Sequence, residues 1–246
     1  MKVCRNIVRQ TFLMRNMNQP HRRSLIGIVS PLLLAAGCAH QPPEQQAAAW
    51  RVAATQPAFK TQLTQAKDLF YRAVAGDADV LAPARQILES LGGGDSPDMQ
   101  VVVYTGAVSL LQARQASLPW EKVGLARAGL DMEDRAVAGA PDDLEVRFLR
   151  GVTNYELPEF IGRHATGVSD LATVAKVAEQ AAREKRLDSR AAAAALDYDA
   201  RSLEAHYKLE GALVEWQAAV RVNADSPGGR DAVKHLAEHD SQASTQ

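Results

Sequence analysis

The sequence has only two cysteines in 246 residues, Cys4 and Cys38, and both lie near its N-terminus. The chain beyond Cys38 therefore has no disulfide, no thiol nucleophile and no cysteine ligand for a metal. Aromatic residues make up only 5% of the sequence, and no segment keeps the alternation of apolar and polar residues that is typical of a half-buried strand. The apolar run Leu25–Ala36 is well short of the roughly 20 residues that a membrane-spanning helix needs.

The same apolar run has the features of a targeting signal. Basic side chains at Arg22 and Arg23 precede it, and the small residues Ala36 and Gly37 separate it from Cys38. This arrangement resembles the lipobox of bacterial lipoproteins, although residue 35 is Ala where Leu is commonest. The resemblance implies that residues 1–37 are a cleaved signal peptide and that Cys38 carries the lipid. A buried structural thiol at Cys38 is the alternative.

The resemblance also implies a location. Ala39 follows the cysteine, where Asp would favour retention in the inner membrane, so we expect an anchor in the bacterial outer membrane, facing the periplasm. A diacylglycerol-bearing cysteine holds a protein more firmly than a single myristoyl chain. Translation from Met17 instead of Met1 would give a more compact leader, and we favour that start.

Removal of the leader changes the charge of the protein. Residues 1–37 contain six Lys and Arg and no acidic residue, so the mature chain has 28 − 6 = 22 basic against 29 acidic residues, a net charge of −7. An acidic body is a poor binder of nucleic acid, because phosphate contacts dominate that affinity. The charge also argues against a body that lies flat on anionic lipid.

Composition divides the mature chain into three parts. Residues 38–57 are rich in Gln, Ala and Pro and are expected to form a lipidated tether. Residues 58–240 are expected to form one helical domain, and residues 241–246 a polar tail. Apolar residues recur at helical spacing from Phe59 to Ala73 and again in later segments. The run Val101–Tyr104 is strand-like, but it lies within a longer helical stripe and is predicted to be helix. Helix breaks are predicted at Gly76, Gly92–Gly94, Leu118–Pro119, Gly139–Pro141, Pro158, Ser189 and Ser226–Gly229.

The spacing of small residues and proline resembles a tetratricopeptide repeat. Pro141 lies five residues after Ala136 and ten before Gly151, and about two units over residues 97–185 show the likeness. It implies an all-α fold of antiparallel helix pairs stacked as a superhelix. A plain helical bundle is the alternative. The segment from Glu145 to Arg163 is also similar to uncharacterised bacterial repeat-like helical proteins, a likeness that implies no chemistry.

Two neighbouring features are candidates for partner binding. Arg147, Arg150 and Asn154 form one polar stripe on a predicted helix, where Asp143 can pair with Arg147. This stripe either binds a partner or is structural and solvated. Phe160, Ile161 and Arg163 follow in a predicted loop, whose apolar residues either pack on the body or contact a partner.

The sharpest enzymatic pattern is His235, Glu238 and His239, which resembles an inverzincin motif with two zinc ligands and a general base. Such a site needs a third protein ligand well downstream, and only seven residues follow His239. We therefore expect a solvated face of the terminal helix. His206 is predicted to lie at the edge of the core. The glycine run Gly92–Gly94 has no lysine and no preceding strand, so it is expected to be a turn.

Together these features predict an all-α, membrane-anchored scaffold lipoprotein that binds an unknown envelope protein or peptide. No catalytic residue, metal site or cofactor is predicted, and nucleic acid is not an expected partner. Two alternatives stay open: a component of outer-membrane protein assembly, and a zinc-dependent hydrolase that uses the C-terminal histidine motif.

Overall fold

A computed structural model describes residues 56–243 of the chain. The described part is built from α-helices and short 3-10 turns and contains no strand, which confirms the all-α prediction. No helix in it is both long enough and apolar enough to cross a membrane. The signal peptide, Cys38 and most of the tether lie outside the described residues.

The helices are α3 (Pro57–Val74), α4 (Leu81–Ser90), α5 (Met99–Gln115), α6 (Pro119–Gly139), α7 (Leu144–Glu156), α8 (His164–Arg183), α9 (Ser189–Ala205), α10 (Leu209–Asn223) and α11 (Pro227–Ala243), with 3-10 turns η1 (Ala78–Val80), η2 (Gly93–Asp95) and η3 (Glu159–Ile161).

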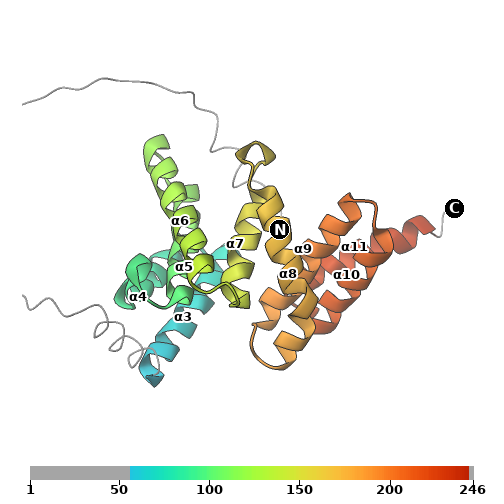
Figure 1. The fold of residues 1–246 in the computed structure, drawn as a ribbon, viewed down its shortest axis with the longest axis horizontal. Coiled ribbons are helices and arrows are strands. Elements are labelled where there is room, and N and C mark those ends of the chain that lie inside the picture. The colour runs from blue at the N-terminus through green and yellow to red at the C-terminus, as the bar shows by residue number, and fades with distance from the viewer. Residues whose placement is uncertain (1–55, 244–246) are drawn as a thin grey trace, which may run out of the picture.

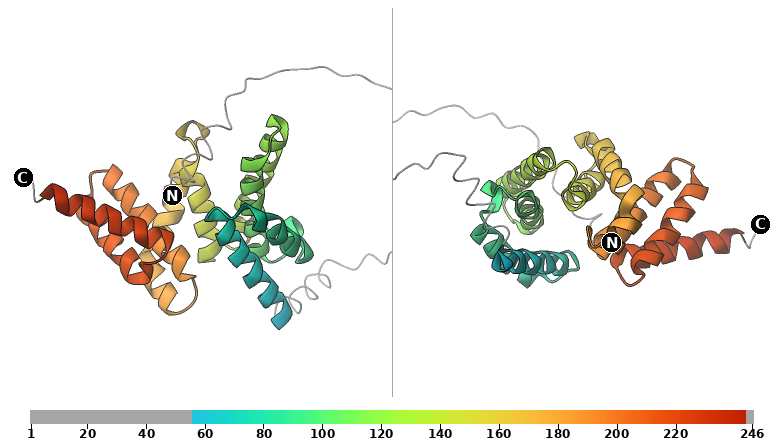
Figure 2. Two further views of the ribbon diagram at one scale, coloured as in Figure 1. Left: turned by 180° about the vertical axis from the view of Figure 1, so that it is seen from behind. Right: turned by 60° about the horizontal axis from the view of Figure 1, so that its bottom comes forward.

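Consecutive helices form antiparallel hairpins that pack side by side (Figure 1). The hairpins are α3–α4, α5–α6, α7–α8 and α9–α10, and α11 packs on both α9 and α10. The first helices of successive hairpins contact one another, and α4, α6 and α8 each pack on the first helix of the next hairpin. Figure 2 shows the resulting elongated array from two further directions.

The core follows the predicted apolar stripes. Val101, Val102, Val103 and Tyr104 are fully buried within α5, which confirms helix for this strand-like run. Helix α5 is covered by α4, α6 and α7, so it is buried on more than one side. A helix that is buried on several sides is apolar on several sides, which accounts for the continuous apolar run.

Small residues set the closest helix approaches. A Cβ atom added to Gly129 on α6 would lie 2.7 Å from the backbone oxygen of Gly106 on α5, so these two backbones are in direct contact. The alanine run of α9 serves the same purpose, since a Cβ on Gly228 of α11 would lie 2.6 Å from Cα of Ala194. Glycine and alanine at these crossings let the hairpins close on one another.

Candidate binding groove on α3, α5, α7 and the α8–α9 turn

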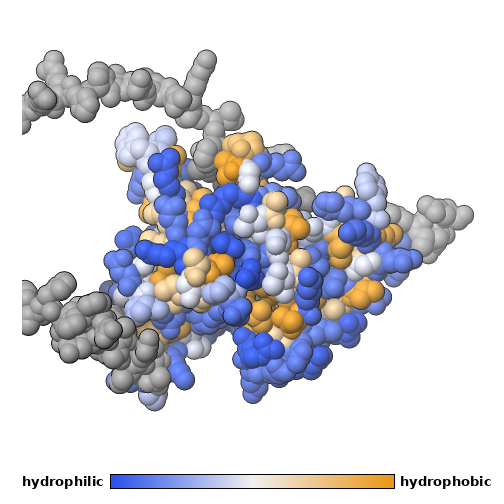
Figure 3. Space-filling view, viewed as in Figure 1, coloured by the Kyte–Doolittle hydropathy of each residue, from blue (hydrophilic) through white to orange (hydrophobic). Residues whose placement is uncertain are grey.

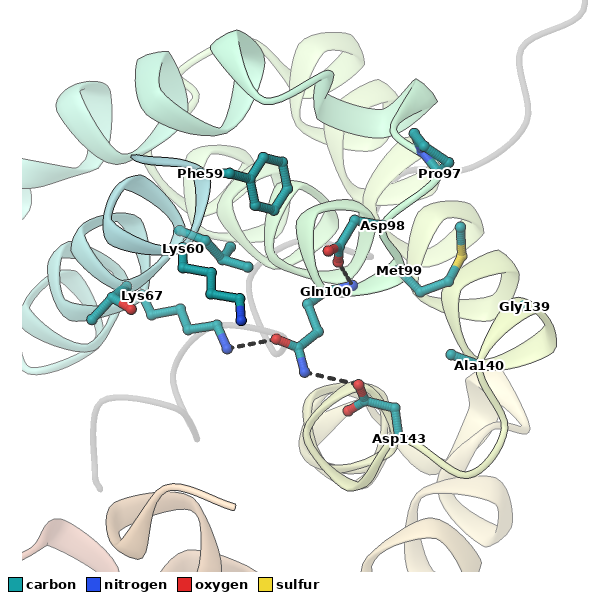
Figure 4. Close-up of a pocket in the computed structure, with 12 residues that line it drawn as sticks. Phe59, Lys60, Lys67, Pro97, Asp98, Met99, Gln100, Gly139, Ala140 and Asp143 are labelled. Carbon is teal, nitrogen blue, oxygen red and sulfur yellow. Dashed lines mark hydrogen bonds between the residues drawn. The ribbon is translucent and has the colours of Figure 1, made fainter. Parts of the chain in front are cut away.

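Two adjoining hollows form one groove on the described part of the molecule. The first encloses about 600 Å³ between α3, the start of α5, the end of α6 and the start of α7 (Figure 4). The second, of about 530 Å³, extends from α3 to the α8–α9 turn and the start of α9. Thr64, Lys67 and Gln100 line both hollows, so the two hollows adjoin, and their lining residues come from all four hairpins.

The groove is built on three equivalent helix starts. Asp98, Asp143 and Asp188 are the N-caps of α5, α7 and α9, and each side chain accepts a hydrogen bond from the backbone N–H two residues later, at 2.8–2.9 Å. These capped positions are spaced 143 − 98 = 45 and 188 − 143 = 45 residues apart. An aspartate cap fixes where each helix begins, so one local interaction sets the same register in three successive hairpins.

The residues two positions after the caps line the groove. They are Gln100, Glu145 and Arg190, which are again 45 residues apart. The first turn of each helix therefore presents one polar side chain to the groove. The array places an amide, a carboxylate and a guanidinium in a row, so the groove has a different chemical character at each hairpin.

Lys67 of α3 connects two of these side chains. Its Nζ donates to Oε1 of Gln100 at 2.8 Å and to Oε2 of Glu145 at 2.6 Å. The amide nitrogen of Gln100 in turn donates to Oδ2 of Asp143 at 2.8 Å, as Figure 4 shows. The hydroxyl of Tyr104 donates to Oε1 of Glu145 at 2.5 Å. This network ties α3 to α5 and α7 and makes the groove floor rigid.

Arg190 closes the other end of the groove. Its guanidinium lies 4.4 Å from the ring centroid of Tyr71 and bonds Asp68 on α3 and Asp188 in the α8–α9 turn. Burial would raise the pKa of Asp188, but hydrogen bonds from the side chain and backbone N–H of Arg190 outweigh it and lower that pKa. Burial raises the pKa of the Tyr71 and Tyr104 hydroxyls. Both phenols therefore stay neutral at physiological pH.

Apolar side chains complete the first hollow. Phe59 and Leu63 of α3 and Met99 of α5 line it beside the Lys67 network (Figure 4). Lining residues of both charges are present and mostly paired with one another. A groove with apolar patches and fixed donors and acceptors suits an extended peptide better than a small polyanion.

The arginines of the predicted polar stripe form ion pairs within the protein. Arg147 and Arg150 both bond the buried carboxylate of Asp170 on α8, each with a nitrogen–oxygen distance of 2.8 Å. Arg147 does not bond Asp143 as expected from the i, i+4 spacing, because Asp143 caps α7 and accepts from Gln100. These pairs hold α7 against α8.

Arg163 and Asn154 belong to a second internal network. Arg163 donates to Oδ1 of Asn154 at 2.8 Å and to the carboxylate of Asp134 on α6 at 2.5 and 2.6 Å. The side chain of Asn154 is fully buried, so it lies inside the protein and not on the surface stripe with Arg147. The predicted loop segment is the 3-10 turn η3, in which Phe160 is 71% exposed and Ile161 is half-buried.

The C-terminal histidines pack on the core instead of facing solvent, which corrects the expected solvated face. The ring of His235 stacks on the fully buried Trp216, with centroids 4.6 Å apart and planes within 7°. His239 stacks on the same indole, and its Nε2 lies 2.8 Å from a carboxylate oxygen of Glu204. Among residues 56–243 no group of three His, Cys, Asp or Glu side chains is placed to hold a metal ion. The two rings serve to attach α11 to α9 and α10.

His206 is also not where the sequence pattern placed it. It is the exposed C-cap residue of α9, and its Nδ1 lies 2.7 Å from the backbone oxygen of Ser202. The helix ends there because Tyr207 adopts a left-handed conformation with φ of 59°. No break was predicted between Ser189 and Ser226, and the structure has two helices there, α9 and α10.

Comparison with known proteins adds no family. No protein-family model, no curated protein and no solved structure matches this chain.

The groove residues were not among the sequence-based candidates. Lys67, Gln100, Glu145 and Arg190 lie on four helices, and no local motif marks them. The 45-residue spacing of the capping aspartates was the available signal. This signal is weak, because only the capping residues and some buried small residues recur at that interval.

Proposed function

We propose that this protein is a lipid-anchored, periplasm-facing helical scaffold that binds a peptide or an exposed segment of an envelope protein in its groove. The observation that carries the proposal is that the two hollows adjoin at Thr64, Lys67 and Gln100 and together span successive hairpins. A groove that crosses successive hairpins is the usual binding surface of stacked helical repeats.

The hairpins form a repeat array in this proposal. Contacts between α3, α5, α7 and α9, and the equal spacing of the aspartates that cap α5, α7 and α9, support a stacked superhelix. The 45-residue interval is longer than the 34 residues typical of a tetratricopeptide repeat and falls within the range of other helical repeats. We therefore keep the superhelix and describe it as a longer-period relative of the tetratricopeptide arrangement.

The membrane attachment in this proposal comes from the lipobox-like segment that ends at Cys38. The tether of residues 38–57 would place the groove in the periplasm at a distance set by its length. The arginine pairs of α7 hold the hairpins in place, and the groove itself contacts the partner.

Site-specific photo-crosslinking tests the groove. Replacement of Thr64 by the photoreactive residue p-benzoylphenylalanine in the full chain, in intact cells, is expected to give one covalent adduct of defined mass. The same residue at Arg85 is the matched control, because Arg85 is exposed on α4 and lines neither hollow. We expect no adduct from position 85.

A second variant removes hydrogen bonds that line the groove and keeps the photoreactive residue at position 64. Gln100→Ala breaks the links from α5 to Lys67 and Asp143 and is expected to lower the Thr64 adduct at least about fivefold. Adducts of equal yield from positions 64 and 85, or a Thr64 adduct that Gln100→Ala leaves unchanged, would show that the groove is not the binding surface.

A further inference from the structure

Exposed apolar side chains are concentrated on three turns of the described part. Eight large hydrophobic side chains are exposed there, and six of them lie in or beside the turns that join α5 to α6, α7 to α8 and α9 to α10. The most exposed members are Trp120 at 72%, Phe160 at 71% and Tyr207 at 97%. Each of the three turns therefore displays one aromatic ring. The other three of the six are Leu118, Val123 and Leu209.

These turns lie on one edge of the molecule. The two helices of a hairpin are antiparallel, so the turns within successive hairpins fall on the same side of the array. Figure 1 shows the three turns at the top of the molecule, and the view from behind in Figure 2 agrees. The space-filling view shows apolar side chains at the tip of the α7–α8 turn on this edge (Figure 3). We call Trp120, Phe160 and Tyr207 with their turns the aromatic edge.

The turns between hairpins have the opposite character. The segments 91–98, 140–143, 184–188 and 224–226 contain none of the exposed large hydrophobic residues. Leu91 and Leu187 in these segments are buried, and the α8–α9 turn exposes Lys185 and Arg186. The asymmetry means that exposed aromatic rings are not a general property of the turns in this protein.

We infer that the aromatic edge inserts into the interfacial region of a lipid bilayer and orients the body on the membrane. The three rings sit on separate turns with charged residues beside them, Glu121 and Lys122 on one turn and Lys208 and Glu210 on another. A protein-binding patch is instead usually contiguous and apolar at its centre. Exposed aromatic rings, Trp and Tyr above all, are enriched at the membrane–water interface.

The charged residues near the three rings indicate which lipid headgroups the aromatic edge can bind. Glu121, Glu159 and Glu210 offset the nearby cations, so the aromatic edge has no basic excess and does not require anionic lipid. Burial of the rings supplies the attraction. This differs from a body that lies flat on anionic lipid, which the net charge of −7 for the mature chain disfavours.

The tether is long enough for this orientation. Helix α3 runs from the opposite edge toward its own turn, a length of about 27 Å for its 18 residues. The segment 39–56 reaches at most about 60 Å when fully extended, at about 3.3 Å per residue. A lipid on Cys38 is therefore compatible with the aromatic edge on the same bilayer. The inference rests in this respect on the proposed anchor.

Vesicle binding tests the aromatic edge separately from the anchor. The full chain with Cys38→Ser carries no lipid, and we expect it to co-sediment with phosphatidylcholine vesicles with little dependence on salt. The variant W120A/F160A/Y207A in this background is expected to bind about tenfold or more weakly. The matched control V214A/V233A removes the two exposed valines that lie away from the edge and is expected to bind within about twofold of the parent.

The outcomes separate the alternatives. Binding that is lost with the three rings and kept without the two valines supports the aromatic edge, whatever the result of lipid labelling at Cys38. No binding by the parent, equal binding by all variants, or binding that requires anionic lipid overturns the inference. Self-association that disappears in W120A/F160A/Y207A, measured by sedimentation without vesicles, also overturns it, since the edge would then be an interface between copies. Circular dichroism of each variant checks that the helices remain intact.

Discussion

Gly129→Ala is expected to lower the free energy of unfolding by about 2 kcal/mol or more. The new methyl carbon would lie 2.7 Å from the Gly106 backbone oxygen and 2.7 Å from Cγ of Leu110. A backbone oxygen cannot move away without separating α5 from α6, and overpacking of this kind costs about 1–3 kcal/mol or more. That cost exceeds the gain of up to about 1 kcal/mol from better helix propensity. The measurement is urea unfolding followed by circular dichroism.

Gly124→Ala is the matched control, because Gly124 lies on the same helix and an added Cβ would meet no atom within 4 Å. This substitution is expected to raise the free energy of unfolding by about 0.5–1 kcal/mol through helix propensity alone. The two substitutions are chemically identical and should have opposite signs. A similar stabilisation by both would mean that α5 and α6 do not cross at Gly106 and Gly129.

Glu133→Gln is expected to stabilise the protein by about 3 kcal/mol near pH 7. Glu133 is fully buried, its Oε1 accepts a bond from Thr153 at 2.9 Å, and its Oε2 has no hydrogen-bond partner among the described residues. Burial raises the pKa of Glu133 to about 8, against the smaller opposing effect of the Thr153 hydrogen bond. The folded protein therefore keeps a proton that the unfolded chain releases, which costs about 1.4 kcal/mol per pH unit.

The pH dependence follows from the same pKa values. Between an ordinary glutamate pKa of about 4.5 and the raised value of about 8, the stability of the wild type falls as pH rises. Glutamine does not titrate, so the advantage of Glu133→Gln should be under about 1 kcal/mol at pH 5 and largest near pH 8. Glu121→Gln, at an exposed position of the same helix, should change stability by less than about 0.5 kcal/mol. A gain for Glu133→Gln that is constant between pH 5 and pH 8 would contradict the buried, protonated state.

Local patterns predicted the helices well because their signals are local. The Gly92–Gly94 run, Pro141 and Pro158 lie between α-helices, and Leu118–Pro119 is the junction at which α6 begins, since glycine and proline act on the backbone of their own segment. The end of α9 at His206 was missed, because it depends on the left-handed conformation of Tyr207, which no residue preference at that position indicates.

The functional surfaces were harder to predict because they are assembled from distant segments. The interpretation of Arg147 and Arg150 depended on Asp170, which lies on the next helix and bonds both. Asn154 falls on the same helical stripe by spacing, yet neighbouring helices bury it completely. The histidine motif likewise gave no indication that Trp216, from another helix, would stack against His235. Periodicity assigns a residue to a helix face, and only tertiary packing decides what covers that face.

Attachment at Cys38 is the claim on which the location, the tether and the orientation of the groove depend. Metabolic labelling of cells with radioactive palmitate, followed by isolation of the protein, tests it directly. We expect the wild-type protein to be labelled and to fractionate with membranes, and Cys38→Ala to carry no label. Absence of label from the wild type, or equal label in Cys38→Ala, would contradict it.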